Sequence, residues 1–215
     1  MKIEVGKETP TYFKKEFPEA FQIFSHLEAV TAIPQVLFAV TTLKENGKSN
    51  VNYHSWSCFQ GDGSGFYAIL AGIYQHTHTF ANVKRTKEFC VNFLPIKYCD
   101  ALAKTIEQNS IDDDEFIVGN FTVEKSTTIS APRIKESFMS LECKVTQIQD
   151  LSGAGRTAMI IGEVQNVAVE QDYASGKKRY GEDGFMYLVH APQNLMNGDC
   201  GQTEAATLNI KRSLD

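Results

Sequence analysis

Short apolar runs separated by turn-forming residues dominate the chain after residue 34. QVLFAVTTL at 35–43 is rich in β-branched and aromatic residues, and Asn46-Gly47 follows it, which is the strongest short hairpin signal in the chain. GFYAILAGI at 65–73 is apolar nearly throughout and follows a glycine-rich turn, which is typical of a strand that is buried on both faces or enters a barrel corner. In SLECKVTQI at 140–148, apolar residues gather near one face and predict a barrel strand with one wet side.

Helical patterns are fewer and shorter than strand patterns. An amphipathic helix is predicted over residues 17–29, a second over 77–87 with Thr79 as its N-cap, and a third over 98–108. The acidic IDDDEF after the third helix indicates a solvated loop or a helix start. Because no βαβ alternation persists, the pattern favours a mainly β fold: an antiparallel barrel with a few peripheral helices.

Length and charge narrow the class of protein. A chain of 215 residues is expected to form one domain, 1–215, with residues 1–30 as an N-terminal helical extension and 191–215 as a C-terminal tail. The net charge is −5 and no basic stripe is present, which argues against nucleic acid binding. No signal peptide core and no run of roughly 20 apolar residues occurs, so a cytoplasmic protein without membrane attachment is expected. The cysteines are scattered without CxxC pairs, which indicates reduced and mostly packed thiols.

The first polar motif lies on the second strand of the predicted hairpin. If the strand continues, Asn50, Asn52 and Trp56 share one face, while Ser55 and Ser57 share the other. Such a face can bind a planar polar ligand. From the strand alone, an exposed edge that carries a packed tryptophan is favoured over a ligand site, because polar strand residues commonly face water.

The second polar motif is QHTHTFAN at 75–82. Hydroxyl and imidazole groups precede a helix start there, where free backbone amides and the helix dipole favour an anion such as phosphate. Lys84 and Arg85 are expected in or just beyond the first turn, within reach of that anion. Simple capping of the helix explains the same residues.

A metal site is a weaker interpretation of the same region. His76 and His78 are ligand types for zinc or iron, and His54 or Cys58 would complete a set. No HExxH motif and no second cysteine pair accompanies them, and no nucleophile motif indicates a hydrolase.

Four segments in order resemble the flavin reductase-like, FMN-binding split-barrel family over most of residues 30–170. They are VTTLKENGKSNVNYHSWS, HTHTFANVKRTKEFCVNF, SAPRIKESFMSLECKV and MIIGEV. The resemblance implies a six-stranded split barrel, a homodimer and FMN bound near the dimer interface. By this resemblance, contacts to the flavin ring and ribityl chain fall on Asn50, Asn52, Tyr53, His54, Ser55 and Trp56. Contacts to its phosphate fall on Thr77, His78, Thr79, Asn82 and Lys84.

The resemblance also implies an activity. We expect an FMN-dependent oxidoreductase that accepts a hydride from NADH or NADPH, for which no catalytic acid or base is needed. Two alternatives remain open: a flavoredoxin-like FMN carrier in electron transfer with no nicotinamide site, and a barrel whose pocket has become an interaction surface. Two departures fall near the pocket. GDGSG stands where family members often carry Pro-Pro, and Gln75 and His76 stand near a frequent arginine.

Overall fold

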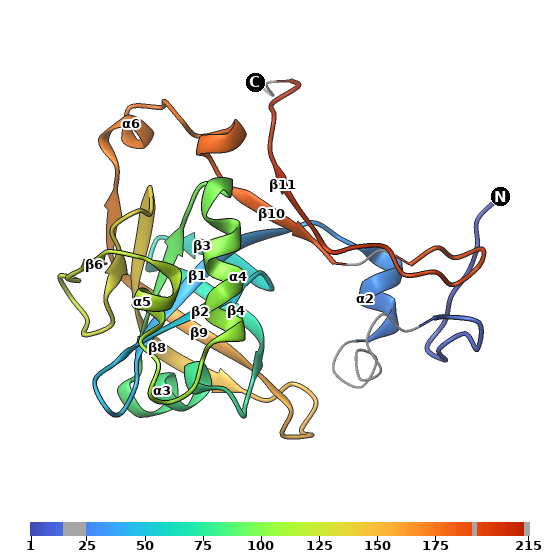
Figure 1. Cartoon of the computed structure of the whole chain (residues 1–215), viewed down its shortest axis with the longest axis horizontal. Coiled ribbons are helices and arrows are strands. Elements are labelled where there is room, and N and C mark those ends of the chain that lie inside the picture. Colours follow the sequence, from blue (N-terminus) through green and yellow to red (C-terminus); the bar gives the residue numbers. More distant parts are fainter. Residues whose placement is uncertain (15–24, 191–192, 213–215) are drawn as a thin grey trace. The chain divides into compact units, whose positions relative to one another are not determined.

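The computed structural model describes residues 1–14, 25–190 and 193–212 (Figure 1). By internal contacts the chain divides into two compact units. The first comprises Met1–Gln35 with Tyr187–Ala206, and the second comprises Val36–Met186 with Thr207–Asp215. The second unit contains both polar motifs.

Antiparallel strands form the second unit. Its strands are β1 (Gln35–Leu43), β2 (Ser49–His54), β3 (Ser57–Asp62), β4 (Gly65–Tyr74), β5 (Glu88–Phe93), β6 (Val123–Glu124), β7 (Arg133–Ile134), β8 (Met139–Gln149) and β9 (Thr157–Val169). Six of them pair in the order β1-β5-β8-β9-β4-β3, β2 pairs with β1, and β6 pairs with β7. The predicted mainly β antiparallel fold is confirmed.

Short helices connect and flank these strands. They are α3 (His78–Thr86), η1 (Ile96–Tyr98), α4 (Cys99–Glu107), α5 (Glu115–Gly119), α6 (Gln171–Ala174) and η2 (Gly181–Asp183). Figure 1 shows α3 at the lower end of this unit, and α4 runs beside β2. The helix predicted at 98–108 is confirmed, and the acidic segment leads into α5, where Asp114 is the N-cap.

The first unit contains α2 (His26–Thr31) and the strands β10 (Met186–Val189) and β11 (Glu204–Thr207), of which β10 begins in the second unit and β11 ends in it. Ser25 caps α2 by accepting a hydrogen bond from the amide of Leu27. Most of the helix predicted over 17–29 lies outside the described residues. Within the described ranges, no helix has the length and apolar composition that crossing a membrane requires.

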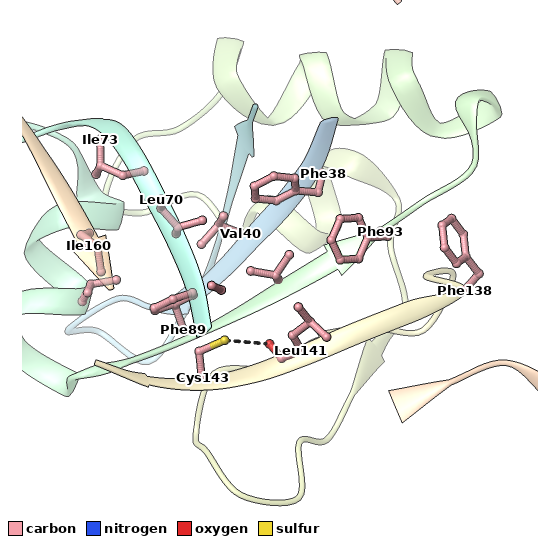
Figure 2. Close-up of a cluster of buried hydrophobic side chains, with 13 residues drawn as sticks. Phe38, Val40, Leu70, Ile73, Phe89, Phe93, Phe138, Leu141, Cys143 and Ile160 are labelled. Carbon is pink, nitrogen blue, oxygen red and sulfur yellow. Dashed lines mark hydrogen bonds between the residues drawn. The ribbon is translucent and has the colours of Figure 1, made fainter. Parts of the chain in front are cut away.

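The core of the second unit fills the space between the strands. Figure 2 shows side chains from β1, β4, β5, β8 and β9 pointing toward one another. The buried set comprises Phe38, Val40, Ala68, Leu70, Ile73, Val83, Phe89, Val91, Phe93, Phe138, Leu141, Cys143 and Ile160. On β4 the side chains of Ala68 and Leu70 are fully buried, whereas their neighbours are half-buried or exposed, so this strand covers the core with one face. The five cysteines are free, and burial raises the pKa of Cys90 and Cys143.

Candidate functional site

Strand β2 and helix α3 are joined by a buried polar seam. Asn50 Nδ2 donates to Thr79 Oγ1 over 3.0 Å, and Asn82 Nδ2 donates to Thr42 Oγ1 over 3.0 Å. Thr42 lies opposite Asn50 across the β1–β2 ladder, and all four side chains are buried. The structure therefore brings the two polar motifs of the sequence together, and it pairs Asn50, Thr79 and Asn82 with one another or with β1.

The N-cap of helix α3 lies two residues earlier in the chain than predicted. Its N-cap is Thr77, whose hydroxyl donates to the carbonyl of Tyr74 at 2.7 Å and accepts from the amide of Phe80 at 3.3 Å. The prediction of Thr79 as N-cap is wrong, because Thr79 already has a helical position in the first turn. Its hydroxyl is held by Asn50 instead.

The start of α3 has the chemistry of an anion site. The amide of Phe80 is taken by the cap and that of Ala81 by the Thr77 carbonyl, so the amides of His78 and Thr79 precede the first intrahelical bond. No acidic residue lies in the first turn. These amides and the positive end of the helix dipole favour a phosphate at this end.

The predicted position of Lys84 is wrong. Because α3 begins at His78, Lys84 lies in its last turn, about 9 Å along the axis from the helix start. Arg85 lies in the same turn and donates from Nη2 to the carbonyl of Leu43 at 2.6 Å. Both side chains therefore start from the end of α3 opposite the first-turn amides.

The chain turns a corner between β2 and β3. β2 ends at His54, Ser55 and Trp56 form the connection, and β3 begins at Ser57 opposite Leu70 of β4. The predicted alternation of faces from Asn50 through Ser57 is therefore wrong beyond His54, because the chain leaves its β1 partner there and pairs with β4. Ser55 is buried, whereas Trp56 is half-buried.

His54 lies beneath this corner with its side chain 5% exposed. Its Nε2 is 2.9 Å from the carbonyl oxygen of Trp56. Burial lowers the pKa of His54 to about 4, against the raising effect of hydrogen bonds with the backbone of Trp56 and Ala71. At neutral pH this imidazole carries no charge.

Tyr53 lies on the face of β2 opposite Asn50 and contacts helix α4. The hydroxyl of Tyr53 lies 3.4 Å from Cys99 Sγ at the start of α4. Burial raises the pKa of Tyr53, and the hydrogen bond with Cys99 and the nearby charges raise it further. Asn52 is half-buried opposite Val40 of β1. Tyr53 thus lies on the opposite face from Asn50, which bonds α3.

Sequence reasoning missed a buried ion pair beside β2. Lys44 Nζ lies 2.9 Å from Glu115 Oε1, and it donates to the carbonyls of Ser110 and Asp113 at 2.7 and 2.8 Å. The amide of Val51 donates to the other oxygen of Glu115 over 2.5 Å. Both charged side chains are at most 1% exposed. The ion pair therefore joins the β1–β2 hairpin to the start of α5, and the two carbonyls join it to the segment before α5.

A second buried carboxylate, that of Glu142 on β8, was also missed. The prediction of a wet outer side for this strand is wrong at Glu142, because the segment 126–133 covers it. Burial alone would raise the pKa of Glu142, but the hydroxyl of Thr128 and the amides of Thr127 and Thr128 donate to it and lower the pKa. Arg133 and Asn166 complete its partners at 3.3 and 3.1 Å.

In the described part of the chain, the two histidines of the second motif do not form a metal site with other side chains. His76 is exposed and its ring lies 5.5 Å from that of Tyr74, while His78 is half-buried. Across the described residues, no three His, Cys, Asp or Glu side chains gather as a metal ion would require.

Comparison with known proteins gives a consistent match. The model of the family described as flavin reductase like domain matches residues 31–195. The structure is similar to that of nitrilotriacetate monooxygenase component B from Bacillus cereus, with a TM-score of 0.72 and 16% identity over 99% of this chain and 100% of that chain. It is similar to a flavoredoxin from Methanosarcina acetivorans, with a TM-score of 0.70 and 16% identity over 100% and 95% of the two chains.

A third similar structure comes from Shewanella frigidimarina and is described as having a split barrel domain. Its TM-score is 0.70, with 20% identity over 94% of this chain and 98% of that chain. At these identities the likeness shows the fold alone. The antiparallel sheet of the second unit is therefore a split barrel.

Proposed function

Because the chain belongs to the flavin reductase-like domain family, we propose that it binds FMN and transfers a hydride from NADH or NADPH to it. The observation that carries this proposal is the hydrogen bond between Asn50 and Thr79. It places the start of α3, which suits a phosphate, beside the strand that leads to the single tryptophan. A planar aromatic ring system with a phosphate chain needs these two elements close together.

The donor set fits such a ligand. The amides of His78 and Thr79 and the hydroxyl of Thr79 would hold the phosphate, with no carboxylate in the first turn to repel it. Trp56 would pack on the ring, and Asn52 and Ser55 would donate or accept at its polar edge. When bound, FMN supplies the group that accepts a hydride from nicotinamide, and the protein contributes binding and orientation.

The same proposal includes the assembly and the compartment. We expect a homodimer with the flavin near its interface, as the family resemblance implies, and a cytoplasmic protein that passes electrons to free flavin, a small acceptor or a redox protein. A second candidate is an FMN carrier with no nicotinamide site. The structural similarity to a flavoredoxin supports this second candidate.

We expect purified protein mixed with FMN and passed through gel filtration to retain a flavin absorbance spectrum with perturbed bands. Under anaerobic conditions NADH or NADPH should then bleach the bound flavin within one turnover. Reduction by dithionite but by neither nicotinamide would identify the carrier. Protein that stays colourless after mixing with FMN would contradict both candidates.

Replacing Thr79 by valine should weaken FMN binding by about 10- to 100-fold, because a hydrogen bond to a charged group contributes about 1.5–3 kcal/mol. The variant keeps the volume of the side chain but removes the hydroxyl that Asn50 also uses. Fluorescence titration of FMN measures the change. The matched control is Thr86→Val at the other end of α3, where the hydroxyl bonds only backbone carbonyls and the Glu88 amide. Equal affinities for the two variants would remove Thr79 from the site.

A further inference from the structure

The carbonyl of Trp56 accepts two hydrogen bonds at the corner between β2 and β3. The amide of Ala71 on β4 donates to it over 2.8 Å, and His54 Nε2 lies 2.9 Å from it. A carbonyl oxygen only accepts, and it has two lone pairs. The contact with His54 is therefore a hydrogen bond in the tautomer that carries the proton on Nε2, and both lone pairs of the Trp56 carbonyl are then used.

The indole of Trp56 is held from a second side by an irregularity in β4. The pairing of β4 with β9 shifts register between Leu70 and Ile73, and Gly72 in this bulge has φ of +66°. A Cβ built on Gly72 would lie 3.5 Å from Cε3 of Trp56, so the indole packs directly on this backbone. The backbone and the ring of Trp56 are thus fixed by different contacts.

The imidazole of His54 packs between other aromatic side chains. It lies opposite Phe38 in the β1–β2 ladder, and its ring packs edge-on against Phe38 at 5.7 Å and against Trp56 at 6.1 Å. The imidazole is thus surrounded by the protein's own rings and backbone.

We propose that His54 is a positioning residue, whose Nε2–H group holds the Trp56 carbonyl and thereby fixes the indole in the flavin site. The effect on flavin binding rests on the proposed function. The hydrogen bond that holds Trp56 belongs to the flavin-free protein. The imidazole does not contact the flavin. Its hydrogen bond limits the movement of Trp56 at the corner between β2 and β3.

The experiment uses Trp56 as its own probe, since it is the only tryptophan in the chain. In the flavin-free protein, His54→Phe should give a red-shifted Trp56 emission and a faster decay of its anisotropy. FMN affinity should fall about tenfold, as for loss of one buried hydrogen bond. His54→Gln, whose amide can donate at a similar reach, should restore most of both signals.

The outcomes separate the two proposals. A folded His54→Phe protein with wild-type emission and anisotropy would overturn the positioning role, whatever its affinity for FMN. Wild-type protein that retains no FMN would overturn the proposed function instead. If His54→Phe does not fold, nitrogen chemical shifts of His54 in the wild type still decide: the Nε2–H tautomer is expected, and the Nδ1–H tautomer would overturn the inference.

Discussion

Replacing Lys44 by methionine should lower the free energy of unfolding by about 3–5 kcal/mol, because it leaves a buried carboxylate without its cation. The side chain of Glu115 is 1% exposed, and only the amide of Val51 would remain as a donor to it. Urea unfolding at pH 7, followed by circular dichroism, measures the change. The loss should shrink toward pH 5, because burial raises the pKa of Glu115 and the unpaired carboxyl takes up a proton.

Two further variants test this explanation of the loss. In the double variant Lys44→Met with Glu115→Met, no unpaired charge remains at this site, so it should be less destabilised than the sum of the two single variants. The matched control is Lys178→Met, which breaks the ion pair with Asp172 at 3.0 Å, where the side chains are 52% and 44% exposed. That change should cost less than about 1 kcal/mol. Additive losses in the double variant would show that the ion pair itself contributes nothing.

The second large effect concerns pH: protonation linked to His54 should lower the free energy of unfolding as the pH falls. A histidine in the unfolded chain titrates near 6.5, whereas burial lowers the pKa of His54 to about 4. Between these values the unfolded chain binds a proton that the folded protein does not, so the stability decreases as the pH falls. At about 1.4 kcal/mol per pH unit, this gap corresponds to ~3 kcal/mol, of which about 2 kcal/mol is lost by pH 5.

Urea unfolding at pH 7, 6 and 5 measures this dependence, and His54→Phe is its control. The variant should start from a lower stability at pH 7 but lose less on acidification, because its ring cannot take up a proton. His190, whose pKa burial also lowers, contributes in the same direction in both proteins and cancels in the comparison. Parallel curves for wild type and variant would show that His54 is not the group responsible.

Features set by neighbouring residues were predictable from the sequence. The hairpin between β1 and β2 follows from Asn46-Gly47, because a tight turn depends on local backbone preferences, and Gly47 indeed has φ of +81°. The helix at 98–108 and the long strand β8 follow from hydrophobic periodicity for the same reason.

Features set by distant partners were not predictable. Thr77 and Thr79 are equivalent as caps in the sequence, and Asn50, on a separate strand, draws the Thr79 hydroxyl away. Lys44 and Glu115 lie in segments so polar that solvent exposure is the natural expectation, yet they meet across 71 positions of the chain. The break at the corner before β3 depends on a change of partner strand, which no residue of the corner signals by itself.

The predicted flavin contacts all come from one uninterrupted stretch, from Asn50 on β2 to Lys84 on α3. The stretch is not independent of the rest of the barrel, because β4 within it pairs with β9 and Gln75 donates to Asp150. Exchanging it for the same stretch of a relative therefore has to keep the β4 positions that pair with β9, together with the side-chain partners Thr42, Cys99 and Glu115, if the barrel is to fold while its cofactor preference changes.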